Sequence, residues 1–388
     1  MKKQKIIIIT SRFPFPLNKG DKLRIYYQIK HLAIYHNIYL ISLNTEGVIK
    51  KIDRQELEKY CKEVHVININ IVTRLINVIL AFFKKEPLQV GYFYSKTAHT
   101  KIKHLIQKID PDWCYGQLIR TAKYIGNYDN NIIDYMDAFS KGVERRVRKF
   151  PKCIQPLIKY EARVIRNYEI SVFNNFKKHS IITKNDQNYI SHKDAGKIEV
   201  IPNGVDTNYF KPIDNSTKKY DIIFVGNMNY PPNIEAAIYI CKKIKPIIDK
   251  KYRTCTILIG GTNPNKKIKK LQNDDITISG WVKDIRSVYS SGHIFVAPMF
   301  IGTGLQNKLL EAMAMGVPCI TTELANKALL ANSSQIIISN NEMEFADACI
   351  DVFKNQEKAT NLRHEGLKFI QEKYDWSKIN NNLNLMFK

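Results

Sequence analysis

Two glycines and a lone acid stand close together near residue 300 of this 388-residue chain. The apolar run His293–Pro298 predicts a strand, Gly302–Gly304 a turn, and Leu305–Met315 a helix. Glycines let a backbone approach a ligand closely, and the free N–H groups at a helix start attract phosphate oxygens. Lys308 adds positive charge in the first turn, and Glu311 can accept hydrogen bonds from two ribose hydroxyls. The stretch therefore predicts a nucleoside diphosphate site.

A simpler interpretation is a tight turn followed by a helix whose acid is solvated. The small residues after Glu311, in AMAMGVP, disfavour it because they indicate close packing of the helix against a sheet. A buried carboxylate is costly without partners, so Glu311 is expected to have them. The chain has no G-x-G-x-x-G after its first strand and no P-loop motif, which excludes both of those phosphate-binding loops.

Short apolar runs alternate with helical segments along the chain, which predicts parallel sheets covered by helices on both faces. The pattern begins with KIIIITS at Lys5–Ser11 and restarts near residue 200 with seven further runs, the first in KIEVIPNGVD. We therefore expect an α/β protein with two Rossmann-like doubly wound domains, at 1–195 and 196–369. A helical segment at 370–388 is expected to pack back toward the first domain.

Composition narrows the partners and the compartment. Hydrophobic residues make up 44% and charged residues 25% of the chain, which is typical of a globular protein. The net charge of +24 calls for an anionic partner, and no nucleic-acid motif or aromatic platform accompanies it. The seven cysteines show no CxxC spacing, so a zinc site or disulfide framework is not indicated and a cytoplasmic, reducing location is expected.

Several segments in order resemble the glycosyltransferases of GT-B architecture, in which two Rossmann-like domains face a central cleft, and among them the large retaining group called family four. The segment at 293–318 resembles the nucleotide-sugar signature of that group, in a branch tied to exopolysaccharide genes. The other matching segments, in chain order, are TSRFPFPLNKGDKLR (Thr10–Arg24), VIPNGVDTNYF (Val200–Phe210), IIFVGNMNYPPN (Ile222–Asn233) and YDWSKI (Tyr374–Ile379).

The resemblance implies roles for individual residues. It implies a donor site made of Gly226, Asn227, Asn229, Gly302, Thr303, Gly304, Leu305, Gln306, Asn307 and Glu311. It implies catalytic roles for Asp137, Lys308 and Glu311, and an acceptor side at Gly20, Asp21, Lys22 and Arg24. For Asp137 a second interpretation, the N-cap of the following helix, stays open.

The sequence also departs from the family pattern. Phe300 and Ile301 stand where the first acid of a glutamate pair is expected, and Asn227 and Asn229 replace an arginine and a lysine. Charge for the diphosphate is then expected from Lys308, with Gln306 and backbone amides. No Asp-x-Asp motif indicates a metal site, so no cofactor or metal is expected.

The resemblance implies transfer of a sugar from a UDP-, GDP- or TDP-linked donor to a glycan, lipid-linked in many family members, in cell-surface polysaccharide synthesis. A nucleotide-sugar epimerase of the same shape and a non-enzymatic anionic-polymer binder are the alternatives. The amphipathic stretch Thr73–Ser95 is aromatic and basic. It fits either a helix packed in the first domain's core or peripheral contact with the anionic inner face of the plasma membrane.

Overall fold

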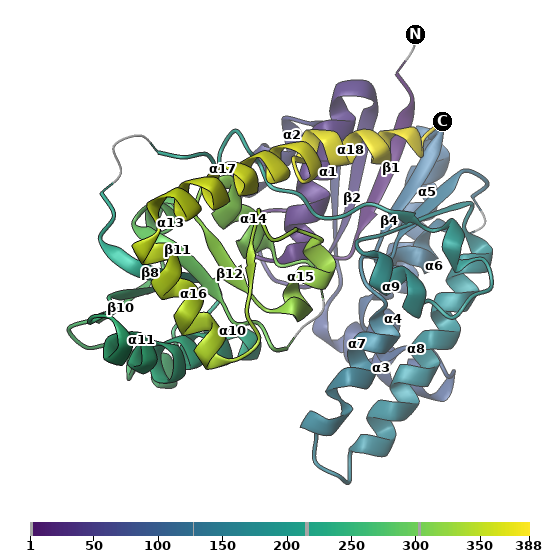
Figure 1. Ribbon diagram of the computed structural model, residues 1–388. Coiled ribbons are helices and arrows are strands. Elements are labelled where there is room, and N and C mark those ends of the chain that lie inside the picture. The colour runs from purple at the N-terminus through teal and green to yellow at the C-terminus, as the bar shows by residue number, and fades with distance from the viewer. Residues whose placement is uncertain (1–2, 127, 214–216, 302–303) are drawn as a thin grey trace. The chain divides into compact units, whose positions relative to one another are not determined.

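The computed structural model describes residues 3–126, 128–213, 217–301 and 304–388. The chain forms two compact units (Figure 1), which we call unit 1, residues 1–202 with 380–388, and unit 2, residues 203–379. The first unit boundary follows Pro202, where the sequence suggested residue 195, and the segment that returns to unit 1 begins at Asn380, where it suggested 370.

Unit 1 is built on a seven-stranded parallel sheet with the order β3-β2-β1-β4-β5-β6-β7. Its central strand β1 is an isoleucine run, Ile6–Ile9, with no exposed side chain, as expected for a strand covered on both faces. The strands are β1 (Lys5–Thr10), β2 (Asn37–Asn44), β3 (Cys61–Asn68), β4 (Trp113–Gln117), β5 (Asn131–Asp134), β6 (Lys178–Ile181) and β7 (Glu199–Val200).

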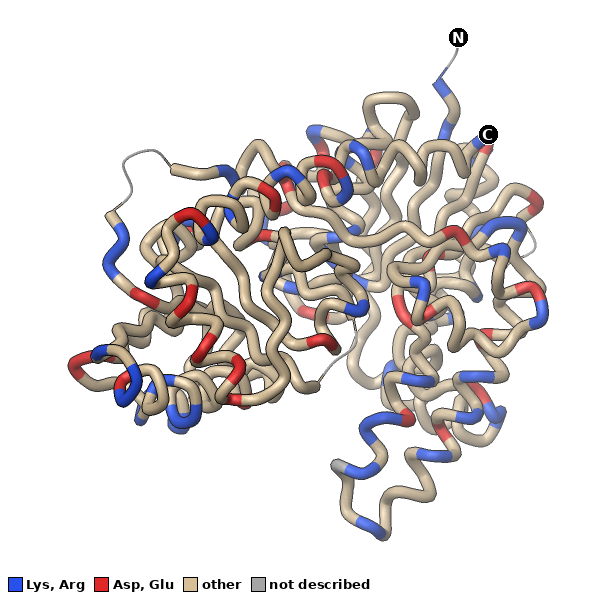
Figure 2. The backbone as a smooth tube through the Cα atoms, viewed as in Figure 1, with Lys and Arg blue, Asp and Glu red and all other residues tan. Residues whose placement is uncertain are grey.

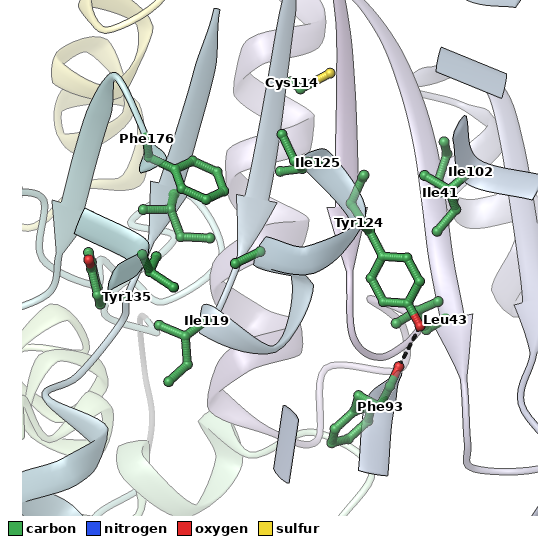
Figure 3. Close-up of a cluster of buried hydrophobic side chains, with 14 of the residues drawn as sticks. Ile41, Leu43, Phe93, Ile102, Cys114, Ile119, Tyr124, Ile125, Tyr135 and Phe176 are labelled. Carbon is green, nitrogen blue, oxygen red and sulfur yellow. Dashed lines mark hydrogen bonds between the residues drawn. The ribbon is translucent and has the colours of Figure 1, made fainter. Parts of the chain in front are cut away.

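Helices connect these strands, and the buried side chains of several of them complete the core around the sheet. In the core cluster of Figure 3, the Tyr124 hydroxyl donates to the Phe93 carbonyl over 2.7 Å, so this buried polar atom is satisfied. The helices are α1 (Gly20–Tyr35), α2 (Lys51–Glu58), α3 (Ile71–Phe83), α4 (Leu88–Phe93), α5 (Lys96–Ile109), α6 (Ala122–Ile125), α7 (Phe139–Arg146), α8 (Gln155–Asn175) and α9 (Lys184–Tyr189).

One strand belongs to the other unit than the sequence suggested. The sequence predicts that the run KIEVIPNGVD begins the second domain, yet Glu199–Val200 pairs in parallel with β6 of unit 1. The Ile201 amide then donates to the Ile181 carbonyl, which extends the pairing. Without β7, strand β6 would be the edge of the first sheet. Pairing of β7 with β6 satisfies backbone N–H and C=O groups of both strands.

Unit 2 contains a second parallel sheet, with six strands in the order β10-β9-β8-β11-β12-β13. The strands are β8 (Tyr220–Val225), β9 (Ile257–Gly260), β10 (Ile276–Gly280), β11 (Gly292–Ala297), β12 (Cys319–Thr321) and β13 (Ile337–Ile338). The helices are α10 (Pro231–Tyr239), α11 (Lys245–Lys251), α12 (Lys266–Lys269), α13 (Arg286–Ser290), α14 (Asn307–Ala314), α15 (Glu323–Leu329), α16 (Glu342–Lys354), α17 (Gln356–Lys373) and α18 (Trp376–Leu385).

Both sheets are doubly wound, so each has a point where the strand order reverses. In unit 1 that point lies between β1 and β4, and in unit 2 it lies between β8 and β11. Ligands of open α/β sheets bind beyond the carboxyl ends of the strands at such a point. Each unit therefore has one position where a site is expected.

The last helix, α18, begins in unit 2 and ends in unit 1. Its end supplies buried core to unit 1, because Leu383 and Phe387 are almost wholly enclosed and the Phe387 ring lies 6.1 Å from that of Trp113. The Asn380 amide also donates to the Tyr27 carbonyl over 3.1 Å. The chain's C-terminus is thus an integral part of unit 1.

Candidate functional site

The start of α14 lies beyond β11, at the reversal point of unit 2. Its N-cap residue Gln306 makes no capping hydrogen bond with its side chain, which donates instead to the Gly304 carbonyl over 3.0 Å. The first turn of α14 therefore keeps amides that Gln306 does not satisfy, and these favour an anion. Gly302 and Thr303, expected in the donor site, lie outside the described residues.

The neighbouring helix α10 follows β8 on the other side of the same point and begins differently. Its first two residues are Pro231 and Pro232, which have no N–H to offer. Of the two helix starts that flank the reversal point, only that of α14 is suited to bind phosphate through its first amides.

Lys308 supplies a cation at this helix start. Its ammonium group donates to the Asn233 side-chain oxygen and lies 5.2 Å from the centre of the Phe224 ring. Burial lowers the pKa of Lys308 to about 8, although the nearby Glu311 carboxylate favours the charged form. Asn233 in turn donates to the Asn227 carbonyl over 3.0 Å. Lys308 is thus held between β8 and β11, where the expected diphosphate would place its charge.

Glu311 lies one turn further along α14 and has the partner that its burial requires. The Tyr289 hydroxyl, fully buried on α13, donates to Glu311 Oε2 over 2.7 Å. Burial raises the pKa of Glu311 to about 7, while the Tyr289 hydrogen bond and the Lys308 charge oppose that rise. Tyr289 fixes one oxygen of the carboxylate, so the group is oriented before a ligand arrives.

Glycines bring the loops after β8 and β9 into contact. Gly261 has φ of +131°, and a Cβ there would stand 1.8 Å from the Gly226 carbonyl oxygen. A Cβ on Gly226 would stand 2.6 Å from the Asn233 side-chain nitrogen. Gly261 thus allows the loop after β9 to approach Gly226, and Gly226 in turn allows the Asn233 side chain to approach.

The remaining expected donor residues lie around the same point. Asn227 and Asn229 are exposed, and the Asn227 side chain accepts from the Asn229 amide over 3.0 Å. Leu305 and Asn307 are partly exposed at the start of α14, and the Asn203 side chain donates to that of Asn307 over 3.4 Å. The structure therefore groups the described donor candidates at one end of the second sheet.

In unit 1, Asp137 follows β5 and does not cap α7. The N-cap of that helix is Ala138, with no side-chain capping bond, so the capping interpretation was wrong. Met136 has φ of +63°, and this turn presents Asp137 as an exposed side chain. Crowding by surrounding protein and the carboxylates of Asp186 and Asp134 raises the pKa of Asp137 to about 6. A carboxylate that is accessible and yet perturbed in this way is a candidate for chemistry.

The expected acceptor-side residues have different surroundings. Arg24 is completely buried and pairs with Asp134, Nε to Oδ2, over 2.6 Å, so its guanidinium is engaged inside unit 1 and shielded from solvent. Lys22 is nearly buried and pairs with Glu46 over 2.8 Å. Gly20 begins α1 with open space around it, and the adjacent Asp21 carboxylate pairs with an arginine over 2.7 Å.

Two arginines that were not among the candidates lie at the reversal point of unit 1. Arg12 follows β1 and is the partner of Asp21; Arg120 follows β4 and donates to the Gln89 side chain over 2.7 and 3.0 Å. Arg120 Nη1 has no hydrogen-bond partner among the described residues. Burial and the Arg12 charge lower the pKa of Arg120 to about 10. Their position directly after two adjacent central strands is the sequence signal that could have identified them.

Residues 219–355, most of unit 2, match the family model Glycosyl transferases group 1. The chain carries a group 1 glycosyltransferase domain. It is accordingly a glycosyltransferase, and its two Rossmann-like domains have the GT-B architecture of its structural relatives.

Two solved structures share this architecture over nearly the full length of both chains. A sucrose-phosphate synthase from Thermosynechococcus elongatus gives a TM-score of 0.70 at 14% identity, covering 99% of this chain and 98% of the other. Anabaena HepE in complex with UDP gives 0.69 at 13% identity, covering 98% of each chain. At these identities the likeness concerns the fold.

Two sequence relatives have informative descriptions. A Klebsiella pneumoniae protein, described as an uncharacterized 44.6 kDa protein in the cps region, is 24% identical over 97% of each chain. An Escherichia coli enzyme, the UDP-Gal:alpha-D-GlcNAc-diphosphoundecaprenol alpha-1,3-galactosyltransferase, is 26% identical over 41% of this chain and 46% of its own.

Metal binding and membrane spanning are the two remaining structural questions for the glycosyltransferase. The described residues contain no group of three or more His, Cys, Asp or Glu side chains placed to hold a metal ion. Among the same residues, none of the helices has the length and apolar character needed to cross a bilayer.

Proposed function

We propose that this glycosyltransferase moves a sugar from a nucleoside diphosphate sugar to a lipid-linked glycan that carries phosphate, with retention of configuration, in cell-surface polysaccharide synthesis. The start of α14 carries the proposal, because it combines uncapped amides, the Lys308 cation and an oriented Glu311 carboxylate at the reversal point of unit 2. UDP is the first nucleotide to test, since HepE was solved with UDP and the E. coli relative is described as using UDP-Gal.

In this proposal the donor lies with its diphosphate against the first turn of α14 and its ribose at Glu311. When the bond between the sugar C1 and the diphosphate oxygen breaks, negative charge grows on the leaving group. Lys308 and the α14 amides are in place to stabilise that charge before the reaction begins, which is the largest contribution available to such a transfer. The reaction then needs no metal, and activity should survive EDTA.

The acceptor is proposed to bind unit 1. Arg12 and Arg120 supply guanidinium groups at its reversal point, and Arg120 Nη1 has no hydrogen-bond partner in the part of the chain that the structure describes. Arginine is suited to bidentate contact with phosphate, which a diphosphate-linked glycan carries. The E. coli relative is described as acting on a diphosphoundecaprenol-linked sugar, and the K. pneumoniae relative belongs to a cps region. Asp137 is the proposed catalytic residue on this side.

The donor site is tested by thermal stability with UDP, GDP, TDP, CDP and ADP. A ligand at about 100 times its dissociation constant adds roughly 2.7 kcal/mol to the free energy of unfolding. One diphosphate should stabilise the wild type and have little effect on Glu311→Ala. Glu323→Ala, which removes an exposed acid at the start of α15, is the matched control and should behave as wild type. No response to any diphosphate would remove the donor site and the proposal with it.

Transfer is tested with a radiolabelled sugar nucleotide and a diphosphate-linked lipid acceptor. Asp137→Asn should lower kcat while leaving nucleotide affinity unchanged, because Asp137 belongs to unit 1 and the nucleotide binds unit 2. Conversion of the nucleotide sugar without any acceptor would favour the epimerase alternative instead.

A further inference from the structure

Helix α3 of unit 1 shows its apolar side to solvent. Eight of its large hydrophobic side chains are exposed, with exposed fractions from 43% at Phe82 to 76% at Phe83. They follow the helical repeat and so share one broad face. The eight residues are Ile71, Val72, Leu75, Ile76, Ile79, Leu80, Phe82 and Phe83.

The opposite, polar face of α3 is the one packed against the protein. The Arg74 guanidinium donates to the Tyr92 hydroxyl over 2.7 Å, and the Asn77 side chain donates to the Tyr94 carbonyl over 2.8 Å. A Cβ on Gly91 of α4 would stand 2.6 Å from the Ala81 Cβ, so the two helices are as close as glycine allows. The orientation of α3 is therefore fixed by specific contacts, and its apolar face is held outward. The sequence allowed Thr73–Ser95 to be a helix packed in the core of the first domain. That interpretation holds for α4 but not for the apolar face of α3.

Further exposed apolar residues lie at and just before the start of α8. The Phe82 and Tyr160 rings lie 6.0 Å apart, which places the end of α3 beside α8 (Figure 1). There Phe150, Ile154 and Leu157 are exposed by 40–46%. We call these three residues and the eight of α3 the apolar face. A large exposed apolar surface, such as the eight side chains of α3 present, marks an interaction site.

Positive charge surrounds this face. Residues 141–159 contain seven Lys or Arg and one acid, Glu144, which already pairs with Lys141 and Arg166. Lys84 and Lys85 directly follow α3 and are exposed. Figure 2 shows Lys and Arg gathered along the protruding ends of α7 and α8. The exposed Lys and Arg residues of these segments are Lys84, Lys85, Arg145, Arg146, Arg148, Lys152 and Lys159.

We propose that the apolar face docks on a bilayer rich in anionic phospholipid, with its side chains in the headgroup region and the surrounding cations on lipid phosphates. An aliphatic and aromatic face bordered by Lys and Arg is complementary to such a surface, since burial and charge attraction act together. This deepens the proposed function by bringing the enzyme to a lipid-linked acceptor, and it is tested without donor or acceptor.

The test is co-sedimentation of the full chain with vesicles of phosphatidylcholine, with and without phosphatidylglycerol. Wild type should bind the anionic vesicles and lose binding as salt rises. Ile79→Ser with Phe83→Ser should reduce the vesicle affinity at least about tenfold, because two apolar side chains no longer leave water. Ile52→Ser, at an isoleucine of α2 that is 70% exposed against 58% for Ile79, is the control and should bind as wild type.

A second pair of variants tests the charge. Arg148→Glu with Lys152→Glu should abolish the preference for anionic vesicles, whereas Lys101→Glu with Lys103→Glu, on the exposed side of α5, gives the same change in net charge and should keep it. Equal binding by all four variants would overturn the proposal. So would self-association of the chain that needs Ile79 and Phe83 and no vesicle. Vesicle binding by a protein that responds to no nucleoside diphosphate would leave the docking face standing and reject the proposed function.

Discussion

Glu311 and Lys308 lie close together at the start of α14, and burial brings their pKa values toward each other. The pKa of Glu311 is raised to about 7 and that of Lys308 is lowered to about 8. Ribose hydroxyls bind the ionised carboxylate, so nucleotide affinity should rise as pH increases through about 7. The diphosphate binds the ammonium form, so affinity should fall as pH increases through about 8. UDP affinity, if UDP is the donor nucleotide, is thus expected to be greatest between these values.

Calorimetric titration of UDP from acid to alkaline pH checks this window. Glu311→Gln should remove the part of the rising limb that lies near pH 7, leaving the ionisation of the nucleotide itself, and Lys308→Met should remove the falling limb. A Glu311→Gln profile identical to that of wild type would show that this carboxylate does not bind the ligand.

At the residue scale, the sequence predicted a partner for the Glu311 carboxylate, and the Tyr289 hydroxyl is that partner, although Glu311 itself is partly exposed. The identity of that partner could not be predicted, because Tyr289 lies on α13, separated from Glu311 by strand β11 and the loop that follows it. Arg24 shows the same limit: its position near the first loop suggested ligand contact, but its carboxylate partner Asp134 comes from a strand far along the chain. Pairings across elements depend on the fold and leave no local pattern.

At the element scale, two glycines with positive φ differ in the space around them and in φ itself, which is +131° at Gly261. Gly280, with φ of +65°, has open space where a Cβ would stand, whereas Gly261 faces the Gly226 carbonyl oxygen at 1.8 Å. Gly280→Ala should cost only the backbone strain, about 1–2 kcal/mol of the free energy of unfolding. Gly261→Ala should cost more, because the loops after β8 and β9 must also separate, and it should weaken nucleotide binding.

Urea denaturation of both variants measures the difference, and nucleotide titration of each measures the second effect. Equal destabilisation with unchanged nucleotide affinity would mean that the contact between the β8 and β9 loops is not needed for the donor site.

Helices and strands with a clear hydrophobic periodicity were predicted well. Elements whose ends depend on a single residue were not. The strand and helix expected at 293–298 and 305–315 are β11 and α14, within two residues at either end. The stretch 73–95 contains two helices because Pro87 cannot continue α3. The apolar face of α3 could be predicted from the sequence. Which side of α3 packs inward depends on contacts with Gly91, Tyr92 and Tyr94, so the exposure of that face could be found only from the structure.

At the scale of the whole molecule, the chain's last residues stabilise one unit while the proposed donor site lies in the other. Phe387 is buried in unit 1 at 1% exposure, whereas Leu385, in the same C-terminal segment, is 54% exposed. Phe387→Ala should therefore reduce the free energy of unfolding of unit 1 by about 3–5 kcal/mol, the usual cost of deleting a buried phenylalanine. Leu385→Ala should change it little.

Two unfolding transitions are expected, one for each unit. The shift that the nucleotide causes shows which transition belongs to unit 2. UDP at about 100 times its dissociation constant should shift only the transition of unit 2, by roughly 2.7 kcal/mol. Phe387→Ala should shift only the other transition and leave UDP affinity unchanged, because no residue of the proposed donor site belongs to unit 1. If both transitions move together in Phe387→Ala, then α18, which runs from one unit into the other, couples them into one cooperative structure. A loss of UDP affinity in the same variant would mean that UDP binding depends on unit 1. That result would contradict a donor site confined to unit 2.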